Sequence, residues 1–285
     1  IDVHLADDQV SGTLKLSYQF DDKTMMYASY GSGFKSGGTN TDRIELGLNP
    51  IFDAETSKTS EIGLKRDFPD LGLRVNLAVH KTDVEDFQAS SFIGNGFVVQ
   101  NAGDFDISGL ELESKWLLTD STTLTFTYAY TDATYGSFEK GPCWTETPWH
   151  TGQTDPGMTL GQNYCDRTGD IPAPHADHTG MLQLSQEFNL SDSVYAIASV
   201  DYNFIGERYL VASNDPLSLH ERTDLINARI NFLLEDYDLN VLVWGRNLTD
   251  ELYPSLGTPA TLQPGKLSGF YADPMTYGIT VMKKF

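Results

Sequence analysis

The sequence predicts an all-β fold, a transmembrane antiparallel β-barrel segment of about eleven strands. Three observations support this prediction. Side chains alternate between apolar and polar with a period of two through most of the chain, short polar turns alternate with long loops, and no apolar run approaches the roughly 18 residues of a membrane helix. A period of two places alternate side chains on opposite faces of a strand.

The predicted strands follow one another as hairpins through all 285 residues, which we treat as one domain. The clearest is 123–131, where Leu124, Phe126 and Tyr128 alternate with threonines, as expected of a strand with one apolar face. Glycines at 103 and 109 suggest a bulge within the predicted strand 97–116. The strands are expected at 10–20, 25–33, 56–67, 73–87, 97–116, 123–131, 179–188, 194–204, 225–233, 239–247 and 270–285.

The connections between these strands are short at one end of the predicted strand meander and long at the other. Short turns are expected near Asp22, Asp70, Asp120, Asp192 and Asp236. Longer loops are expected near Thr39, Asn95, Gly152, Asn214 and Pro259, and the long extracellular loops span about 34–55, 136–174 and 252–268. This segregation is typical of an outer-membrane barrel, whereas a soluble β-sandwich has no reason to sort its loops by end.

The last stretch, 270–285, has the pattern of a strand between lipid and a polar lumen. Tyr277, Ile279 and Val281 share one face with the terminal Phe285, and we expect this C-terminal strand to serve barrel assembly. Lys283 lies on the same face and departs from the apolar pattern. The alternative is an ordinary amphipathic strand at the end of a soluble β-sandwich.

The net charge of the chain limits the kinds of macromolecule that it can bind. The net charge is -21 and the pI is near 4.4, which argues against nucleic-acid binding because that needs a basic footprint. No signal peptide is visible and Ile1 falls within a repeating pattern, so we expect this chain to be the later part of a longer polypeptide.

The segment 136–174 is the candidate ligand-binding loop. Cys143 and Cys165 would form one disulfide there in an oxidising compartment. Aromatic rings and a guanidinium could grip an aromatic or anionic ligand, and the alternative is a self-packed surface loop. The candidate substrate-binding residues are Trp144, Trp149, His150, Tyr164 and Arg167.

No catalytic group, metal site or cofactor site is predicted. The glycine-rich stretch 31–37 lacks the ending of a phosphate loop, and His220 lacks the second histidine of a zinc-protease motif. His175 and His178 are three apart, which on a strand puts them on opposite faces.

Four stretches together resemble the C-terminal half of the barrel of TonB-dependent outer-membrane receptors. They are 27–38 (YASYGSGFKSGG), 55–65 (ETSKTSEIGLK), 101–113 (NAGDFDISGLELE) and 244–253 (WGRNLTDELY). The resemblance implies a 22-stranded barrel of which this chain supplies the second half. The family's N-terminal plug and its energy-coupling box would lie outside this chain segment.

The resemblance also implies a function, which is active import of a scarce ligand, such as a ferric siderophore, across a Gram-negative outer membrane. The implied partners are the TonB–ExbB–ExbD complex acting through the plug, outer-membrane lipid, a small-molecule ligand such as a metal chelate, and in some members a surface lipoprotein. No bond in the ligand is made or broken, so the protein is not expected to be an enzyme. The alternative function is a passive porin or a structural barrel.

Overall fold

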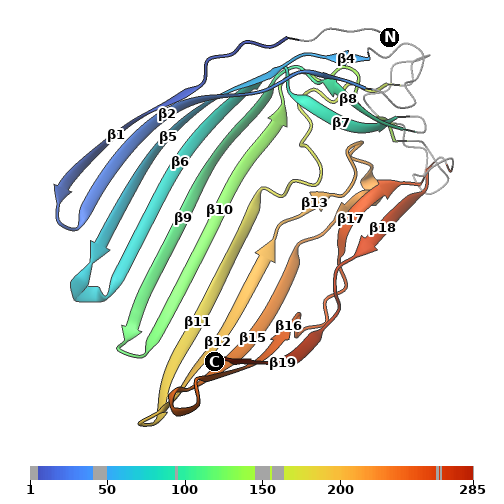
Figure 1. Cartoon of the computed structure of the whole chain (residues 1–285). Helices are drawn as coiled ribbons and strands as arrows, with labels where there is room; N and C mark the ends of the chain where they lie inside the picture. The colour runs from blue at the N-terminus through green and yellow to red at the C-terminus, as the bar shows by residue number, and fades with distance from the viewer. Residues whose placement is uncertain are drawn as a thin grey trace.

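The computed structural model describes residues 6–40, 50–93, 96–144, 155, 164–260, 263 and 265–284, apart from the side chains of 91–93, 96 and 97. Eleven strands form one antiparallel sheet whose spatial order follows the chain, which confirms the predicted meander (Figure 1). The sheet curves into an open trough, in keeping with part of a barrel wall. Its strands are β1 (Gly12–Asp21), β2 (Thr24–Lys35), β5 (Glu55–Phe68), β6 (Leu73–Glu85), β9 (Phe105–Thr119), β10 (Thr122–Tyr135), β11 (His178–Ser191), β12 (Val194–Ile205), β15 (Thr223–Leu234), β16 (Leu239–Arg246) and β19 (Thr276–Lys283).

Short and long connections lie at opposite ends of this sheet, as Figure 1 shows. The short turns include two single 3-10 turns, Pro69–Leu71 and Glu235–Tyr237. Four of the long connections carry a small two-stranded ladder that supplies backbone hydrogen bonds. These ladders pair β3 (Gly38–Thr39) with β4 (Ile51–Phe52), β7 (Gln88–Ile93) with β8 (Gly96–Asn101), β13 (Arg208–Tyr209) with β14 (Leu219–His220), and β17 (Pro254–Pro259) with β18 (Leu267–Tyr271).

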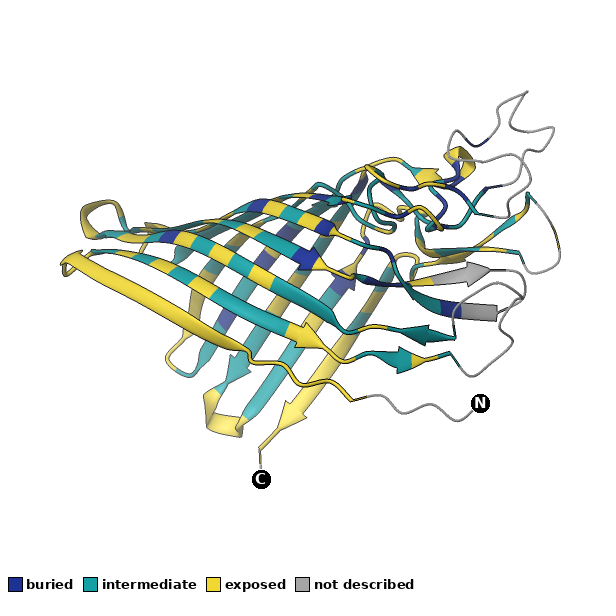
Figure 2. Cartoon of the chain, turned by 90° about the horizontal axis from the view of Figure 1, so that it is seen from above, coloured by how far each residue is buried: buried dark blue, intermediate teal, exposed yellow. Residues whose placement is uncertain are grey.

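The two faces of the sheet differ in chemistry. Residues paired directly across antiparallel strands share a face, so the register sorts the side chains. The row through Leu124, Leu184 and Val200 continues an apolar face, while the neighbouring row through Thr125, Gln183 and Asp201 is polar. Exposure alternates along inner strands such as β2 and β5, whereas the edge strand β1 is exposed throughout (Figure 2). In a membrane barrel the apolar face contacts lipid and the polar face lines the lumen.

This assignment makes a testable prediction at the middle of β11. Leu184→Arg in the full-length protein is expected to lower the free energy of unfolding in lipid by about 2–4 kcal/mol, because it places a charge on the lipid face. Gln183→Arg is the matched control and is expected to cost far less, since it faces the lumen beside Asp201. Denaturant titration in vesicles measures both. Equal costs would contradict the assignment of faces.

The predicted single strand 97–116 is divided in the structure between β8, which holds 97–101, and β9, which holds 105–116. The chain leaves β8 at Asn101 and enters β9 at Phe105, and Gly103 between them has φ +72°, a left-handed conformation that glycine adopts freely. A Cβ there would lie 2.1 Å from Ser137 Oγ. Gly109 is not a bulge, since it pairs in register with His80 on one side and Thr131 on the other.

Among the described strands, β19 pairs with β16 alone and forms one edge of the sheet, and β1 forms the other. Tyr277, Ile279 and Val281 are between 62% and 79% exposed, as expected of an outward face. Phe285 lies outside the described residues. Within the described residues, no helix is long and apolar enough to cross a membrane.

A compact apolar cluster sits at the long-loop end of β6, β9 and β10. Phe105 stacks on Phe87 with 4.6 Å between ring centroids, and Tyr135 contacts Phe138 at 4.9 Å. Burying these side chains anchors the base of the long connections to the rigid sheet. This cluster positions the candidate loop described next.

Candidate ligand-binding loop

The loop between β10 and β11 is joined at its base by backbone hydrogen bonds. Gly169 N donates to Tyr135 O at 2.7 Å, and Arg167 N donates to Phe138 O at 2.8 Å. Further out, Gly141 and Cys165 exchange two bonds, N to O, of 2.9 and 3.0 Å. The two arms of the loop therefore run side by side before they reach the disulfide.

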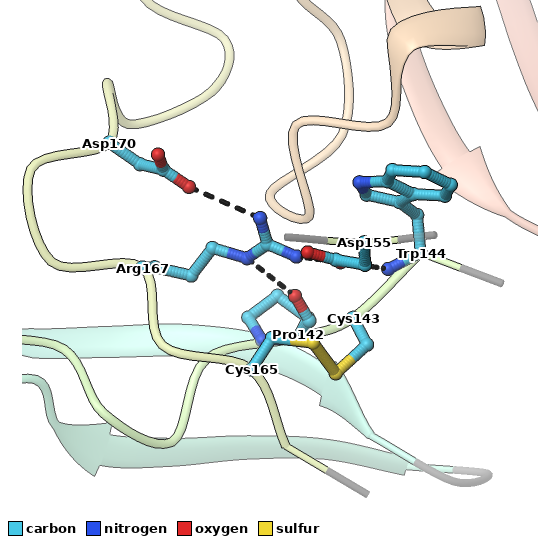
Figure 3. Close-up of a disulfide and its surroundings, with 7 residues drawn as sticks. All are labelled: Pro142, Cys143, Trp144, Asp155, Cys165, Arg167 and Asp170. Atoms are coloured by element: carbon cyan, nitrogen blue, oxygen red, sulfur yellow. Dashed lines mark hydrogen bonds and ion pairs between the residues drawn. A yellow bond between two sulfur atoms is a disulfide. The ribbon is translucent and has the colours of Figure 1, made fainter. Parts of the chain in front are cut away.

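The predicted disulfide is present in the structure. Cys143 and Cys165 are bonded with 5.2 Å between their Cα atoms and a sequence separation of 22 (Figure 3). In the chain-entropy account, closing a loop of this size stabilises the native state by about 3 kcal/mol. Asp155 lies within reach of both sulfur atoms, but disulfide sulfurs are not thiolate ligands and this grouping makes no metal site.

Arg167 is a buried structural ion partner within the loop. Its side chain is 4% exposed, and it forms ion pairs with Asp155 and, at 3.1 Å, with Asp170. Its Nε donates to Pro142 O at 2.9 Å, and Figure 3 shows the guanidinium held between these groups. Buried charges in proteins are normally paired in this way because an unpaired one is costly.

Asp155, which lies between the two cysteines in the sequence, is the buried partner of Arg167. Its carboxylate is fully buried and also accepts a hydrogen bond of 2.9 Å from Trp144 N. The Trp144 side chain is itself buried beside the disulfide. The disulfide, the ion pair and the indole thus form one knot, which we call the stapled knot (Cys143, Trp144, Asp155, Cys165 and Arg167).

The five candidate binding residues differ in where they lie in the structure. Trp144 and Arg167 belong to the stapled knot, and Tyr164 stands next to it and is partly exposed. Trp149 and His150 lie outside the described residues. The Arg167 guanidinium is buried and paired with two carboxylates inside the stapled knot. In this geometry Arg167 stabilises the loop and is not exposed to an anionic ligand.

Sequence reasoning missed Asp155, which is the main partner of Arg167. No local spacing rule links two residues 12 apart in an irregular loop, so only the folded arrangement reveals the pair. The exposed Asp166 has its pKa lowered by hydrogen bonds from the side chain and backbone N–H of Thr168, which fixes the turn before Gly169.

The histidines near this loop have separate partners. His175 Nε2 lies 2.8 Å from Thr131 O, and His178 Nδ1 lies 2.8 Å from the Tyr128 hydroxyl. In the neighbouring connection, burial and the nearby Arg208 lower the pKa of His220. His220 is thus held toward its neutral form beside Thr223, with Nε2 3.2 Å from the hydroxyl.

A meander of eleven strands with an apolar face, a polar face and long loops at one end defines the wall of an outer-membrane β-barrel. The family model described as TonB dependent receptor-like, beta-barrel, matches residues 2–250. The chain therefore belongs to the TonB-dependent receptor family, whose barrels lie in the outer membrane.

Individual relatives agree with this assignment. The pesticin receptor of Yersinia pestis is 34% identical over 111 residues, which cover 39% of this chain and 16% of that protein. The ferric yersiniabactin uptake receptor FyuA from Yersinia pestis has a TM-score of 0.70 at 19% identity, covering 96% of this chain and 37% of that one. The siderophore receptor PiuA from Acinetobacter baumannii has a TM-score of 0.64 at 17% identity, covering 95% and 35%. This chain thus spans little more than a third of the solved relatives.

Proposed function

We propose that the full-length protein imports a scarce small ligand, such as a metal chelate, across the outer membrane. The observation that carries this proposal is the family match over residues 2–250 on a half-barrel with long connections, one of which is closed by a disulfide. Proteins of similar fold include receptors named for ferric yersiniabactin uptake and for siderophores. Import moves the ligand without making or breaking its bonds, so the protein acts as a receptor and transporter and not as an enzyme.

Energy is proposed to come from the TonB–ExbB–ExbD complex, acting on a plug encoded elsewhere in the polypeptide. The lumen face of the sheet supplies a polar wall for such a plug, for example Asn76 bonded to Glu113 and Arg229 lying 3.9 Å from Asp201. A surface lipoprotein partner stays a prediction from the family resemblance.

Uptake from iron-limited cells tests this function. Deleting the full gene is expected to lower uptake of radioactive iron supplied as the strain's own secreted chelates, and the full-length gene should restore it. Removing TonB should abolish the restored uptake, because import against a gradient needs energy. Restored uptake that persists without TonB would instead identify a passive porin.

The candidate loop, 136–174, is proposed to capture the ligand. Changing Trp144 and Trp149 to Ala, singly and together, is expected to weaken ligand binding without preventing barrel assembly. Trp144→Ala should act by loosening the loop, because its side chain is buried. Equilibrium binding of the secreted chelate measures the effect, and heat-modifiable migration checks the barrel. Unchanged binding in the double variant would count against this loop.

A further inference from the structure

The long connections carry a strong excess of negative charge. The described parts of the segments 36–54, 86–104, 136–177, 206–222 and 247–275 contain 14 Asp and Glu residues and 5 Lys and Arg residues, a net charge of -9. These parts hold somewhat less than half of the chain's net charge of -21. They all lie at one end of the sheet, so the charge is concentrated where a ligand first meets the protein.

The guanidinium groups of the described arginines in these segments already have partners within the protein. Arg167 is paired with Asp155 and Asp170 in the stapled knot. Arg222 Nε lies 2.9 Å from Asp224 Oδ1, and its guanidinium stacks on Phe204. Arg208 is buried and donates to Gly206 O and the Thr223 hydroxyl, both at 3.4 Å. Among the described residues of these segments, none of the three arginines therefore offers a guanidinium without a partner for bidentate hydrogen bonds to an anionic ligand.

Several carboxylates in the same segments are exposed. Glu139, Glu207 and Glu221 are each exposed, and no hydrogen bond or ion pair is found for them within the described part of the chain. Solvated charges of one sign lining a mouth set up a potential that enriches ions of the opposite sign.

The strand residues that face the lumen differ from the long connections in their charge balance. The register places seven cationic and seven anionic strand residues on the polar face, so their formal charges cancel. The cations are Lys15, Lys35, Lys65, Arg74, Lys115, Arg229 and Arg246, and the anions are Glu55, Glu61, Asp67, Glu111, Glu113, Glu187 and Asp201. The lumen-facing strand residues therefore do not share the negative excess of the long connections.

We propose that the extracellular connections form an electrostatic filter that favours metal complexes of neutral or positive charge and repels polyanionic chelates. This inference rests on the proposed import function and names its substrate class. A ferric tris-hydroxamate is neutral, because three monoanionic ligands balance Fe³⁺, and it passes this filter. A ferric tris-catecholate carries three negative charges and is repelled.

The filter is tested with two paramagnetic complexes of similar size and opposite charge. A nitroxide is attached to Ser268→Cys, at an exposed position of β18, in the full-length receptor in phosphatidylcholine vesicles. Power saturation then measures its collisions with tris(ethylenediamine)chromium(III), charge +3, and tris(oxalato)chromate(III), charge -3. At low salt we expect the cation to collide about tenfold more often, or more. The ratio should approach one in 1 M salt, where the Debye length is about 3 Å.

Two controls locate the effect. A label at the lumen position Thr127→Cys should give a ratio nearer to one. The substitutions E139Q, E207Q and E221Q, combined with the Ser268→Cys label, should lower the ratio without altering barrel assembly. A ratio of one or less at Ser268→Cys in low salt would overturn the filter, whether or not the receptor imports anything.

Receptor-dependent uptake supplies the second readout. Iron delivered as a ferric tris-hydroxamate is expected to enter at least as well as iron delivered as a ferric tris-catecholate. Preferential receptor-dependent uptake of the tris-catecholate would overturn the proposal while leaving the import function intact. If neither complex enters, the collision ratio alone decides the proposal, and the import function is judged by the TonB-dependent uptake of the strain's own chelates.

Discussion

Residues 1–285 expressed alone are expected to give no folded, monodisperse species in detergent. The sheet of described strands ends in two open edges, β1 with 10 residues and β19 with 8. Each backbone group left unpaired in hydrocarbon costs several kcal/mol, so two such edges exceed the net stability of a typical domain. Edge strands of this length also recruit other chains, which leads to aggregation.

Supplying the rest of the polypeptide is the matched comparison. Refolding the segment together with the remaining part of the receptor, as a separate chain, should restore heat-modifiable migration and a single sedimenting species. The full-length receptor under the same conditions shows what folded protein gives. A stable, monodisperse barrel from residues 1–285 alone would show that the segment closes without a partner.

Arg167→Met in the full-length receptor is expected to destabilise the candidate loop by about 3–5 kcal/mol, because it leaves the buried Asp155 carboxylate without its counter-charge. The barrel itself should stay assembled, since the strands on either side pair independently of this ion pair. Hydrogen exchange of the amides of Phe138, Gly141 and Cys165 measures the loss directly. The exchange rates of these amides should rise by at least a hundredfold.

Two further variants show whether charge burial is the cause. Adding Asp155→Asn to Arg167→Met should recover much of the protection, because neither charge is then buried alone. Arg222→Met breaks the half-exposed pair with Asp224 and is expected to cost no more than about 1 kcal/mol. Equal effects of Arg167→Met and Arg222→Met would contradict the role given to the stapled knot.

The repetitive part of the fold was open to prediction from the sequence. A strand such as β10 carries apolar and polar side chains in strict alternation, and one buried or lipid-facing side is enough to fix its register. The turn signals near Asp120 and Asp192 then set where each hairpin reverses. At these positions the local sequence pattern favours the same strands and turns that the whole fold requires, so the pattern alone was sufficient to predict them.

Prediction was less successful where contacts come from distant segments. Gly103 looked like a bulge inside a strand, but its left-handed backbone and the close approach of Ser137 end β8 there instead. For Arg167, a candidate ligand-binding residue, the sequence did not indicate the partners Asp155, Asp170 and Pro142 that surround its guanidinium. Neither outcome leaves a periodic trace in the sequence, because the first depends on a contact between two different connections and the second on how the two arms of the β10–β11 loop meet.

The strands of a barrel wall meet lipid on one face and the lumen on the other, and a scan of β11 and β12 tests this division most directly. Nitroxides placed at successive positions from 181 to 186 and from 196 to 201 of the full-length receptor, in lipid vesicles, report collisions with dissolved oxygen. We predict a period of two, with high oxygen collision rates at Leu182, Leu184 and Val200 and low rates at Gln183 and Asp201. A profile without alternation, or water contact on both faces, would contradict the barrel.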